Sequence, residues 1–129
     1  MEKIGVGFIK LDEWAEIPEY ETRGAAGCDI GIAARDEIIL YPNEVRSIPT
    51  GFAIRIPTGY EGQIRSRAGM TRKGIVVANA PATIDSEHTG EIKILLLNVT
   101  EKPVRVFPKQ KVAQIVFSPI VKAEFQFEK

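Results

Sequence analysis

Glycine and proline interrupt this chain so often that few segments are long enough for an ordinary helix. Eleven glycines and eight prolines fall among the 129 residues, and the segments between them are short and rich in Val, Ile, Tyr and Phe. Such residues favour extended structure, whereas Gly, Pro and Asn favour turns. The expected strands are Ile38–Tyr41, Val45–Ile48, Gly51–Ile56, Gln63–Arg67, Gly74–Val77, Glu91–Asn98, Val104–Phe107 and Lys111–Phe117.

The expected strands follow one another at short, nearly regular intervals, which is typical of an all-β sandwich, jelly roll or small barrel. In Phe52–Ile56 the even-numbered positions are apolar and are expected to face a core, with Arg55 facing solvent. One short helix is expected around Ala68–Lys73. Because the chain has the length of one domain, we predict a single domain over residues 1–129.

The composition excludes several classes of function. Lys and Arg together number 17, as do Asp and Glu, so the formal net charge is zero. Neither a nucleic-acid polymer nor an anionic membrane is therefore expected as a partner. No window approaches the roughly 20 apolar residues of a membrane helix, and the first residues do not resemble a signal peptide. We predict a cytoplasmic protein, or one of the host cytoplasm if the gene is viral.

One cysteine and one histidine restrict the chemistry further. Cys28 is the only cysteine and His88 the only histidine, so intrachain disulfides and clusters of Cys and His metal ligands are excluded. No Walker A, dinucleotide-binding or Gly-x-Ser-x-Gly motif is present. Any chemistry is expected to use carboxylates, arginines, backbone amides and a hard cation such as Mg²⁺.

A basic segment lies in the middle of the chain. Arg65–Gly74 contains three arginines, one lysine and two glycines. Glycine lets backbone amides approach an anion, and guanidinium groups can fork onto phosphate oxygens. The alternative is a solvated basic turn between two strands, which is common on protein surfaces.

A second polar segment, Ala78–Ile92, follows directly. It combines an amide at Asn79, a carboxylate at Asp85 and an imidazole at His88 between two apolar segments. The amide of Asn79 could read a base edge with its donor and acceptor, and Asp85 could activate a water molecule. The alternative is that residues 84–90 form no more than the tip of a hairpin.

These two segments and two others resemble, in order and spacing, the trimeric deoxyuridine triphosphatase (dUTPase) family, and the similarity covers most of the chain. Part of Ile17–Ile30 is similar to the family's first motif, Ala-Gly-Tyr-Asp-Leu, and Arg65–Met70 to the second, Pro-Arg-Ser-Gly-Leu. Asn79–Ile92 is similar to the third motif, which reads the uracil, and Lys111–Phe117 to the fourth, Arg-Ile-Ala-Gln-Leu. Pro49–Phe52 and Ile56–Glu61 match the strand, turn and strand that follow the first motif.

The resemblance implies a jelly-roll-like or distorted β-barrel subunit in a homotrimer, with active sites at subunit interfaces. It also implies hydrolysis of dUTP to dUMP and pyrophosphate with Mg²⁺. Asp85 would orient and deprotonate the attacking water, and Asp29 would support the metal through water. The phosphate-binding residues would be Arg67, Ala68, Gly69 and Gln114, and the nucleoside-binding residues Asn79, Thr83, Ile84 and His88.

Several positions depart from the family pattern. Ala68 replaces a serine, Ala82 a glycine and His88 a tyrosine, and Val121–Lys129 lacks the glycine-rich fifth motif that closes over the substrate. These departures leave two alternatives open: a weak or inactive trimer with a binding or regulatory role, and a pyrophosphatase for a different deoxynucleotide. Deamination of dCTP on the related fold is not expected, because Lys93–Leu95 replaces the strand that carries the deaminase's glutamate.

Overall fold

The computed structural model describes all residues, 1–129, and contains twelve strands and one short helix. The strands are β1 Gly7–Lys10, β2 Glu19–Tyr20, β3 Gly27–Gly31, β4 Ile38–Leu40, β5 Val45–Pro49, β6 Phe52–Arg55, β7 Tyr60–Ser66, β8 Ile75–Val77, β9 Ala82–Ile84, β10 Lys93–Asn98, β11 Val104–Val106 and β12 Lys111–Pro119, and the helix is α1 Ala68–Arg72. All eight expected strands are present with ends shifted by up to three residues, and the helix is confirmed.

Four strands were not expected from the sequence, namely β1, β2, β3 and β9. Three of them pair with neighbours farther along the chain, β1 with β6, β3 with β12 and β9 with β7, whereas β2 pairs with the nearby β3. Hydrogen bonds to those neighbours decide the conformation where local propensity is weak, as in the glycine-containing sequence of β3.

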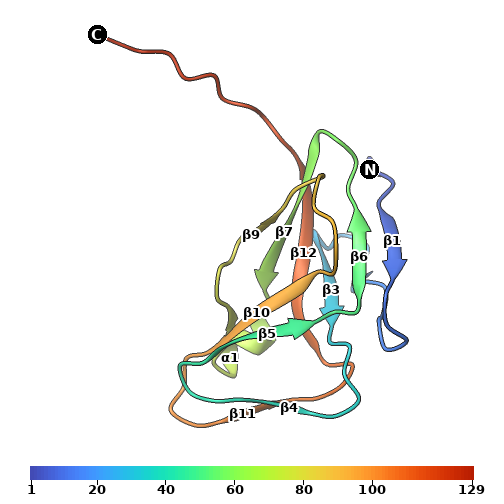
Figure 1. Cartoon of the computed structure of the whole chain (residues 1–129), viewed down its shortest axis with the longest axis vertical. Helices are drawn as coiled ribbons and strands as arrows, with labels where there is room; N and C mark the ends of the chain where they lie inside the picture. Colours follow the sequence, from blue (N-terminus) through green and yellow to red (C-terminus); the bar gives the residue numbers. More distant parts are fainter.

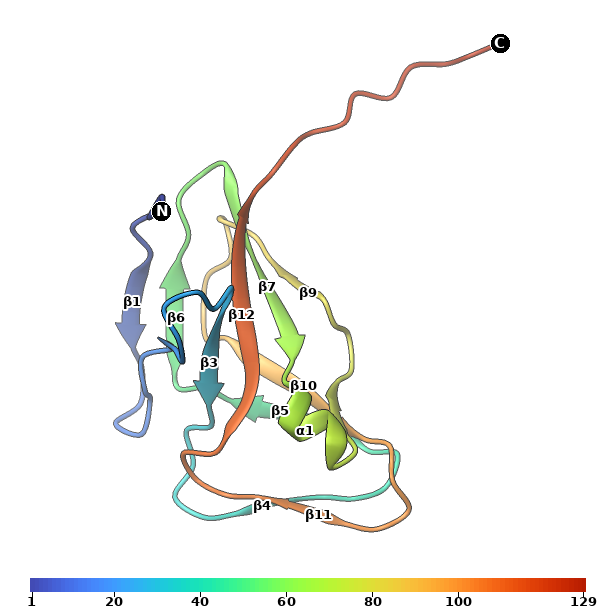
Figure 2. The ribbon, with the colours of Figure 1, turned by 180° about the vertical axis from the view of Figure 1, so that it is seen from behind.

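The strands form four sheets that enclose one core. The largest has the order β2-β3-β12-β7-β9, a second has the order β5-β10-β8, and β1–β6 and β4–β11 are two-stranded ribbons. The β5–β10 pair crosses in front of β12, and the β4–β11 ribbon closes the opposite end of the molecule from the tail (Figures 1 and 2). The fold is all-β and jelly-roll-like, and no sheet closes on itself as a barrel.

The core consists of 21 buried apolar residues contributed by all four sheets. Phe52, Ile54 and Ile56 are buried and Arg55 is exposed, as the alternation predicted, although Ala53 on the other face of β6 is buried as well. One polar side chain, Asn98, is completely buried. Its amide donates to the carbonyls of Leu40 and Lys102 at 2.9 and 2.8 Å, so both N–H donors of this buried side chain have acceptors.

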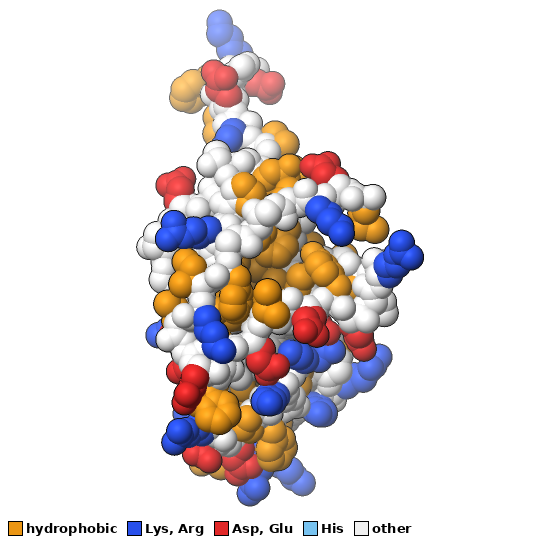
Figure 3. Space-filling model, turned by 90° about the vertical axis from the view of Figure 1, so that its right-hand side faces the viewer, with side chains coloured by type: hydrophobic (Ala, Val, Ile, Leu, Met, Phe, Trp, Pro, Cys, Tyr) orange, Lys and Arg blue, Asp and Glu red, His pale blue; other side chains and the backbone are white.

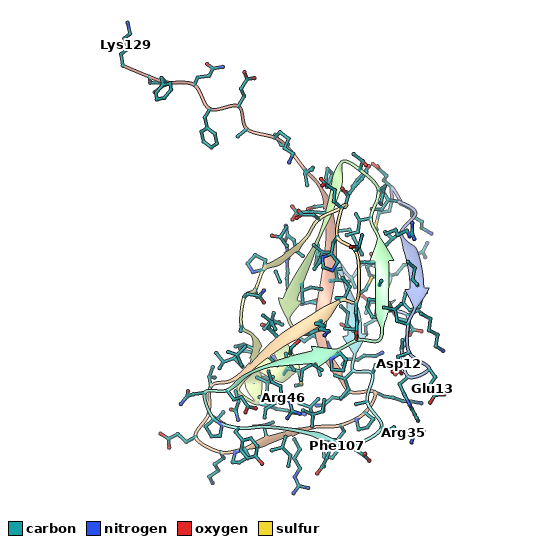
Figure 4. The ribbon with its side chains drawn as sticks, in the orientation of Figure 1. Asp12, Glu13, Arg35, Arg46, Phe107 and Lys129 are labelled. Carbon is teal, nitrogen blue, oxygen red and sulfur yellow. The ribbon has the colours of Figure 1, made fainter.

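Beyond β12 the chain leaves the body of the molecule. Residues 121–129 are exposed and project outward with their side chains clear of the core (Figure 4). On the side that carries β1 and β6, hydrophobic side chains gather near the middle and charged side chains surround them (Figure 3). No helix in the structure has the length and apolar character needed to cross a membrane.

Candidate active site

The central strand β12 brings three of the sequence motifs together. Gln114 on β12 pairs with Asp29 on β3 and, on its other side, with Arg65 on β7. Residues paired in this way point to the same face of a sheet. The five-stranded sheet therefore carries a row of polar side chains from motifs that are far apart in sequence.

The guanidinium group of Arg67 is held at one end of this row. Its Nε lies 3.0 Å from Oδ1 of Asp29, and its Nη1 donates to the carbonyl of Lys111 at 3.1 Å. Only 27% of the Arg67 side chain and 14% of the Asp29 side chain are exposed, so the pair is partly withdrawn from water. Its Nη2 also lies 3.9 Å from Oε2 of the exposed Glu21. A guanidinium held in this way keeps a defined direction, which suits it to bind an anion that takes the place of the exposed Glu21 contact.

The side chain of Gln114 is fixed as well. Its Nε2 donates to the carbonyl of Ser66 at 3.1 Å, and its carbonyl end lies over Gly27. A Cβ on Gly27 would come within 2.3 Å of Gln114 Oε1, so only glycine leaves room for the amide in this position. Ser66 is anchored in turn, because its hydroxyl accepts a hydrogen bond from the amide of Val77 at 2.9 Å.

The helix α1 begins directly after Arg67. Arg67 is extended, with φ −93° and ψ 141°, and no side chain caps the helix. Ala68 and Gly69 are exposed, while Met70 is buried and fastens the helix to the core. The first amides of a helix have no acceptor within it, so those of Ala68 and Gly69, directly after Arg67 in the chain, have no intrahelical acceptor.

Behind this cluster lies the only cysteine, in contact with Tyr20. A hydrogen bond to Cys28, together with burial, raises the pKa of the Tyr20 hydroxyl to about 12. Burial raises the pKa of the Cys28 thiol, against an opposing hydrogen bond from Tyr20. Cys28 is 6% exposed, and a protonated, buried thiol of this kind packs as a small apolar side chain.

The predicted catalytic aspartate lies at the other end of the same sheet. β9 pairs with β7 so that Ile84 faces Gly62, which places the next residue, Asp85, beside Glu61. Asp85 lines a pocket of about 290 Å³ together with Glu61, Thr83 and the segment 119–122. Ile84 points inward and is 9% exposed, so only its backbone is accessible to a ligand.

The remaining nucleoside-binding candidates lie apart from that pocket. His88 lines a second pocket of about 380 Å³ with Ile9, Ala53 and Arg55. Its backbone nevertheless stays close to Asp85, because the amide of His88 donates to the carbonyl of Asp85 at 3.0 Å. Asn79 is exposed on the turn after β8. The single chain therefore does not gather the four candidates around one pocket.

The two halves of the predicted site are well separated within one chain. Asp85 lies beside Glu61, and Arg67 follows Glu61 by six residues in extended backbone. At about 3.4 Å per residue this corresponds to roughly 20 Å. A phosphate held by Arg67 is thus out of reach of a water held by Asp85 of the same chain.

Comparison with known proteins identifies the family. The family model described as dUTPase matches residues 13–129. The chain belongs to the dUTPase family. The deoxyuridine 5'-triphosphate nucleotidohydrolase of Chlamydia pneumoniae is 45% identical over 119 residues, covering 92% of this chain and 82% of that protein. The enzyme of the same name from Anaeromyxobacter sp. is 46% identical over 110 residues, covering 84% and 74%.

Solved dUTPase structures share the fold. A mutant dUTPase from phage phi11 of S. aureus, described as coordinating a structural Mg(II) ion, superposes with a TM-score of 0.87 at 25% identity and covers 98% of this chain and 97% of its own. The dUTPase of Staphylococcus bacteriophage 80alpha superposes with a TM-score of 0.89 at 24% identity, covering 98% and 89%. The jelly-roll-like prediction is thereby confirmed.

Some residues that shape the site in this dUTPase were not predicted from the sequence. Glu61 lies beside Asp85, Gly27 makes room for Gln114, and the carbonyl of Lys111 orients Arg67. Gly27 and Lys111 fall inside segments that match family motifs. Glu61 ends a segment that matches the family's strand, turn and strand, but nothing in that match indicates a site residue, because the pairing of β7 with β9 is what brings Glu61 to the pocket.

Proposed function

We propose that this dUTPase-family protein hydrolyses dUTP to dUMP and pyrophosphate at sites shared between the subunits of a homotrimer. Membership of the family and the high identity to named deoxyuridine 5'-triphosphate nucleotidohydrolases support the reaction. The observation that carries the proposal in this chain is the cluster of Asp29, Arg67 and Gln114, assembled from three motifs around β12.

This cluster would bind the triphosphate. The fixed guanidinium of Arg67 neutralises charge on the phosphate oxygens, and the first amides of α1, at Ala68 and Gly69, donate to them. Gln114 adds an amide held by Ser66. Most of the catalysis in phosphoryl transfer comes from positioning and charge neutralisation, and a preorganised set of this kind supplies both.

Asp85 would act at the scissile bond. Its carboxylate accepts a proton from a water molecule, and the water oxygen forms a new bond to phosphorus as the P–O bond to the pyrophosphate breaks. Pyrophosphate leaves with the electron pair of that bond. Thr83 lies in the same pocket, and its exposed side chain, with the backbone at Ile84, would contact the nucleoside. Asn79 would read the base edge and His88 the sugar.

A magnesium ion fits this site only as a partner of the substrate. No group of three or more His, Cys, Asp or Glu side chains is arranged to hold a metal, and one oxygen of Asp29 is engaged by Arg67. Mg²⁺ is commonly bound through one or two carboxylates, waters and substrate phosphates. Asp29 would therefore hold it through water, and the ion would supply charge neutralisation on the triphosphate.

The separation of Asp85 from Arg67 supports a site completed by a second subunit. A second observation favours association: the outer face of the β5-β10-β8 sheet is apolar. Leu97 pairs with Val45 on one side and Val76 on the other, and 55% of Val45 remains exposed. An uncovered apolar sheet face of this kind is typical of a subunit interface.

A cytoplasmic location, a single domain and the absence of a fifth motif stay predictions.

Pyrophosphate release tests the reaction directly. We would assay dUTP, dCTP, dTTP, dATP, dGTP and UTP with Mg²⁺, with Asp85→Asn as the matched variant. Selective turnover of dUTP that falls by roughly two to four orders of magnitude in Asp85→Asn is the expected result. Preference for another nucleotide would point to Ala68, Ala82 and His88 as a changed specificity, and no turnover by a folded trimer would favour a regulatory protein.

Complementation tests the shared site. Arg67→Ala and Asp85→Asn are each expected to be inactive alone. If the two groups meet across an interface, trimers assembled randomly from equal amounts of both chains regain about one intact site in four. Sites contained in one chain would show no recovery, and that result would refute the shared arrangement.

A further inference from the structure

The segment that carries Asp85 and His88 is fastened to the rest of the protein mainly at its two ends. Outside the strands it has one internal backbone hydrogen bond, from the amide of His88 to the carbonyl of Asp85 at 3.0 Å. The side chains of residues 85–90 form no hydrogen bond or ion pair within the chain. The first end is set by the pairing of β9 with β7, so the position of the segment depends on how its second end, at residues 91 and 92, is held.

Glu91 and Ile92 hold the second end against the turn between β5 and β6. The amide of Gly51 donates to Oε2 of Glu91 at 3.0 Å, and the amide of Ile92 donates to the carbonyl of Phe52 at 2.8 Å. The hydroxyl of Thr50 donates to the carbonyl of Ile92. Three hydrogen bonds thus join two segments that are about 40 residues apart in sequence.

The turn is itself rigid, so it can serve as an anchor. Thr50 is 1% exposed, and the carbonyl of Gly51 accepts the amides of Leu11 and Asp12 at 2.8 and 3.0 Å. Gly51 has φ +73°, a conformation that favours glycine. Its missing Cβ would lie 2.8 Å from the Cβ of Ala33. Asp12 lies at the same corner of the molecule, beyond the end of β1 (Figure 4).

We propose that Glu91 is a positioning residue for Asp85 and His88, acting through its hydrogen bond to the amide of Gly51. The bond connects the loop of the proposed catalytic aspartate to a buried turn. Loss of the acceptor leaves the Gly51 amide without a partner and lets the loop shift, and a displacement of about 1 Å can lower a rate roughly a hundredfold. This role in catalysis rests on the proposed hydrolysis of dUTP.

The test compares Glu91→Ala with Glu91→Gln in the full chain, because glutamine keeps an oxygen acceptor for Gly51. Thr100→Val is the matched structural control. It removes hydroxyl hydrogen bonds to Asn98 and Lys102 at the far end of β10, away from residues 85–92. Two quantities are measured: kcat and KM for dUTP, and the proton NMR resonance of His88, which is the only histidine and needs no substrate to report on the loop.

The expected result is that Glu91→Ala lowers kcat by roughly tenfold to a hundredfold and shifts or broadens the His88 resonance. Glu91→Gln restores both, and Thr100→Val lowers the melting temperature without changing either. Equal losses in Glu91→Gln and Glu91→Ala, or an unchanged His88 resonance in Glu91→Ala, would overturn the proposal. If the wild type does not hydrolyse dUTP while the His88 resonance responds as expected, the positioning contact stands and the proposed function fails.

Discussion

Gly27 allows a test of the proposed phosphate-binding cluster, because one added methyl group would displace the amide end of Gln114. In Gly27→Ala the new Cβ would lie 2.3 Å from Oε1, 3.0 Å from Cδ and 3.2 Å from Cβ of Gln114. Ordinary contact begins near 3.4 Å, so the amide end must move by about 1 Å. That movement breaks the 3.1 Å hydrogen bond from Gln114 to the carbonyl of Ser66.

The cost of this change falls on function rather than on folding. The largest overlap is with the end of a flexible side chain, the contact with Gln114 Cβ at 3.2 Å requires a shift of only a few tenths of an ångström, and alanine also reduces the entropy of the unfolded chain by about 0.4–1 kcal/mol. The melting temperature is therefore expected to stay near that of the wild type. If the amide of Gln114 binds phosphate as proposed, displacing it by about 1 Å is expected to lower kcat/KM roughly tenfold to a hundredfold, or about 1.4–2.7 kcal/mol in the barrier.

The assay is steady-state release of pyrophosphate from dUTP, with thermal unfolding measured on the same samples. Gly24→Ala is the matched control, because a Cβ there meets nothing within 4 Å. We expect Gly24→Ala to behave as the wild type in both measurements. A Gly27→Ala variant with wild-type kcat/KM would refute the reasoning, since it would show that the position of Gln114 does not matter to the reaction.

Three further predictions follow from other contacts. Arg67→Lys loses the paired contacts to Asp29 and the Lys111 carbonyl, so KM for dUTP should rise even though the charge is kept; an unchanged KM would contradict this role. Asn98→Ala removes the side-chain donor to the carbonyl of the buried Leu40 and one of the two side-chain donors to the carbonyl of the exposed Lys102, so it should lower the free energy of unfolding in urea by about 1–3 kcal/mol; a loss below about 0.5 kcal/mol would argue against this role of Asn98. The pKa of Tyr20 is about 12 in the folded protein against 10.0 for a free tyrosine, so the folded state keeps this proton longer. Its contribution to stability is complete below pH 10 and is lost as the pH rises toward 12; Tyr20→Phe should lack this alkaline loss, and an identical pH dependence would refute the assignment.

Local sequence was sufficient to predict the strands that have strong propensity of their own. Seven of the eight expected strands are rich in apolar or β-branched residues, and the polar Gln63–Arg67 is the exception; all eight have formed. The four others are short or contain Gly and Ala, as in β3 and β9, and are stabilised by long-range pairing. Because a strand is completed by a distant partner, its existence can depend on residues far from it in sequence.

The sequence alone determined the fold class, the family resemblance and the residue types available for chemistry, because these depend on local pattern and on motif order. It identified Asp29, Arg67, Gln114 and Asp85 as candidates, but it did not determine which of them meet. The tertiary structure decided that the first three gather around β12, whereas Asp85 lies roughly 20 Å from Arg67 along the sheet. Strand register is set by burial of one face across the whole core, so which side chains meet depends on residues throughout the chain and not on the motifs alone.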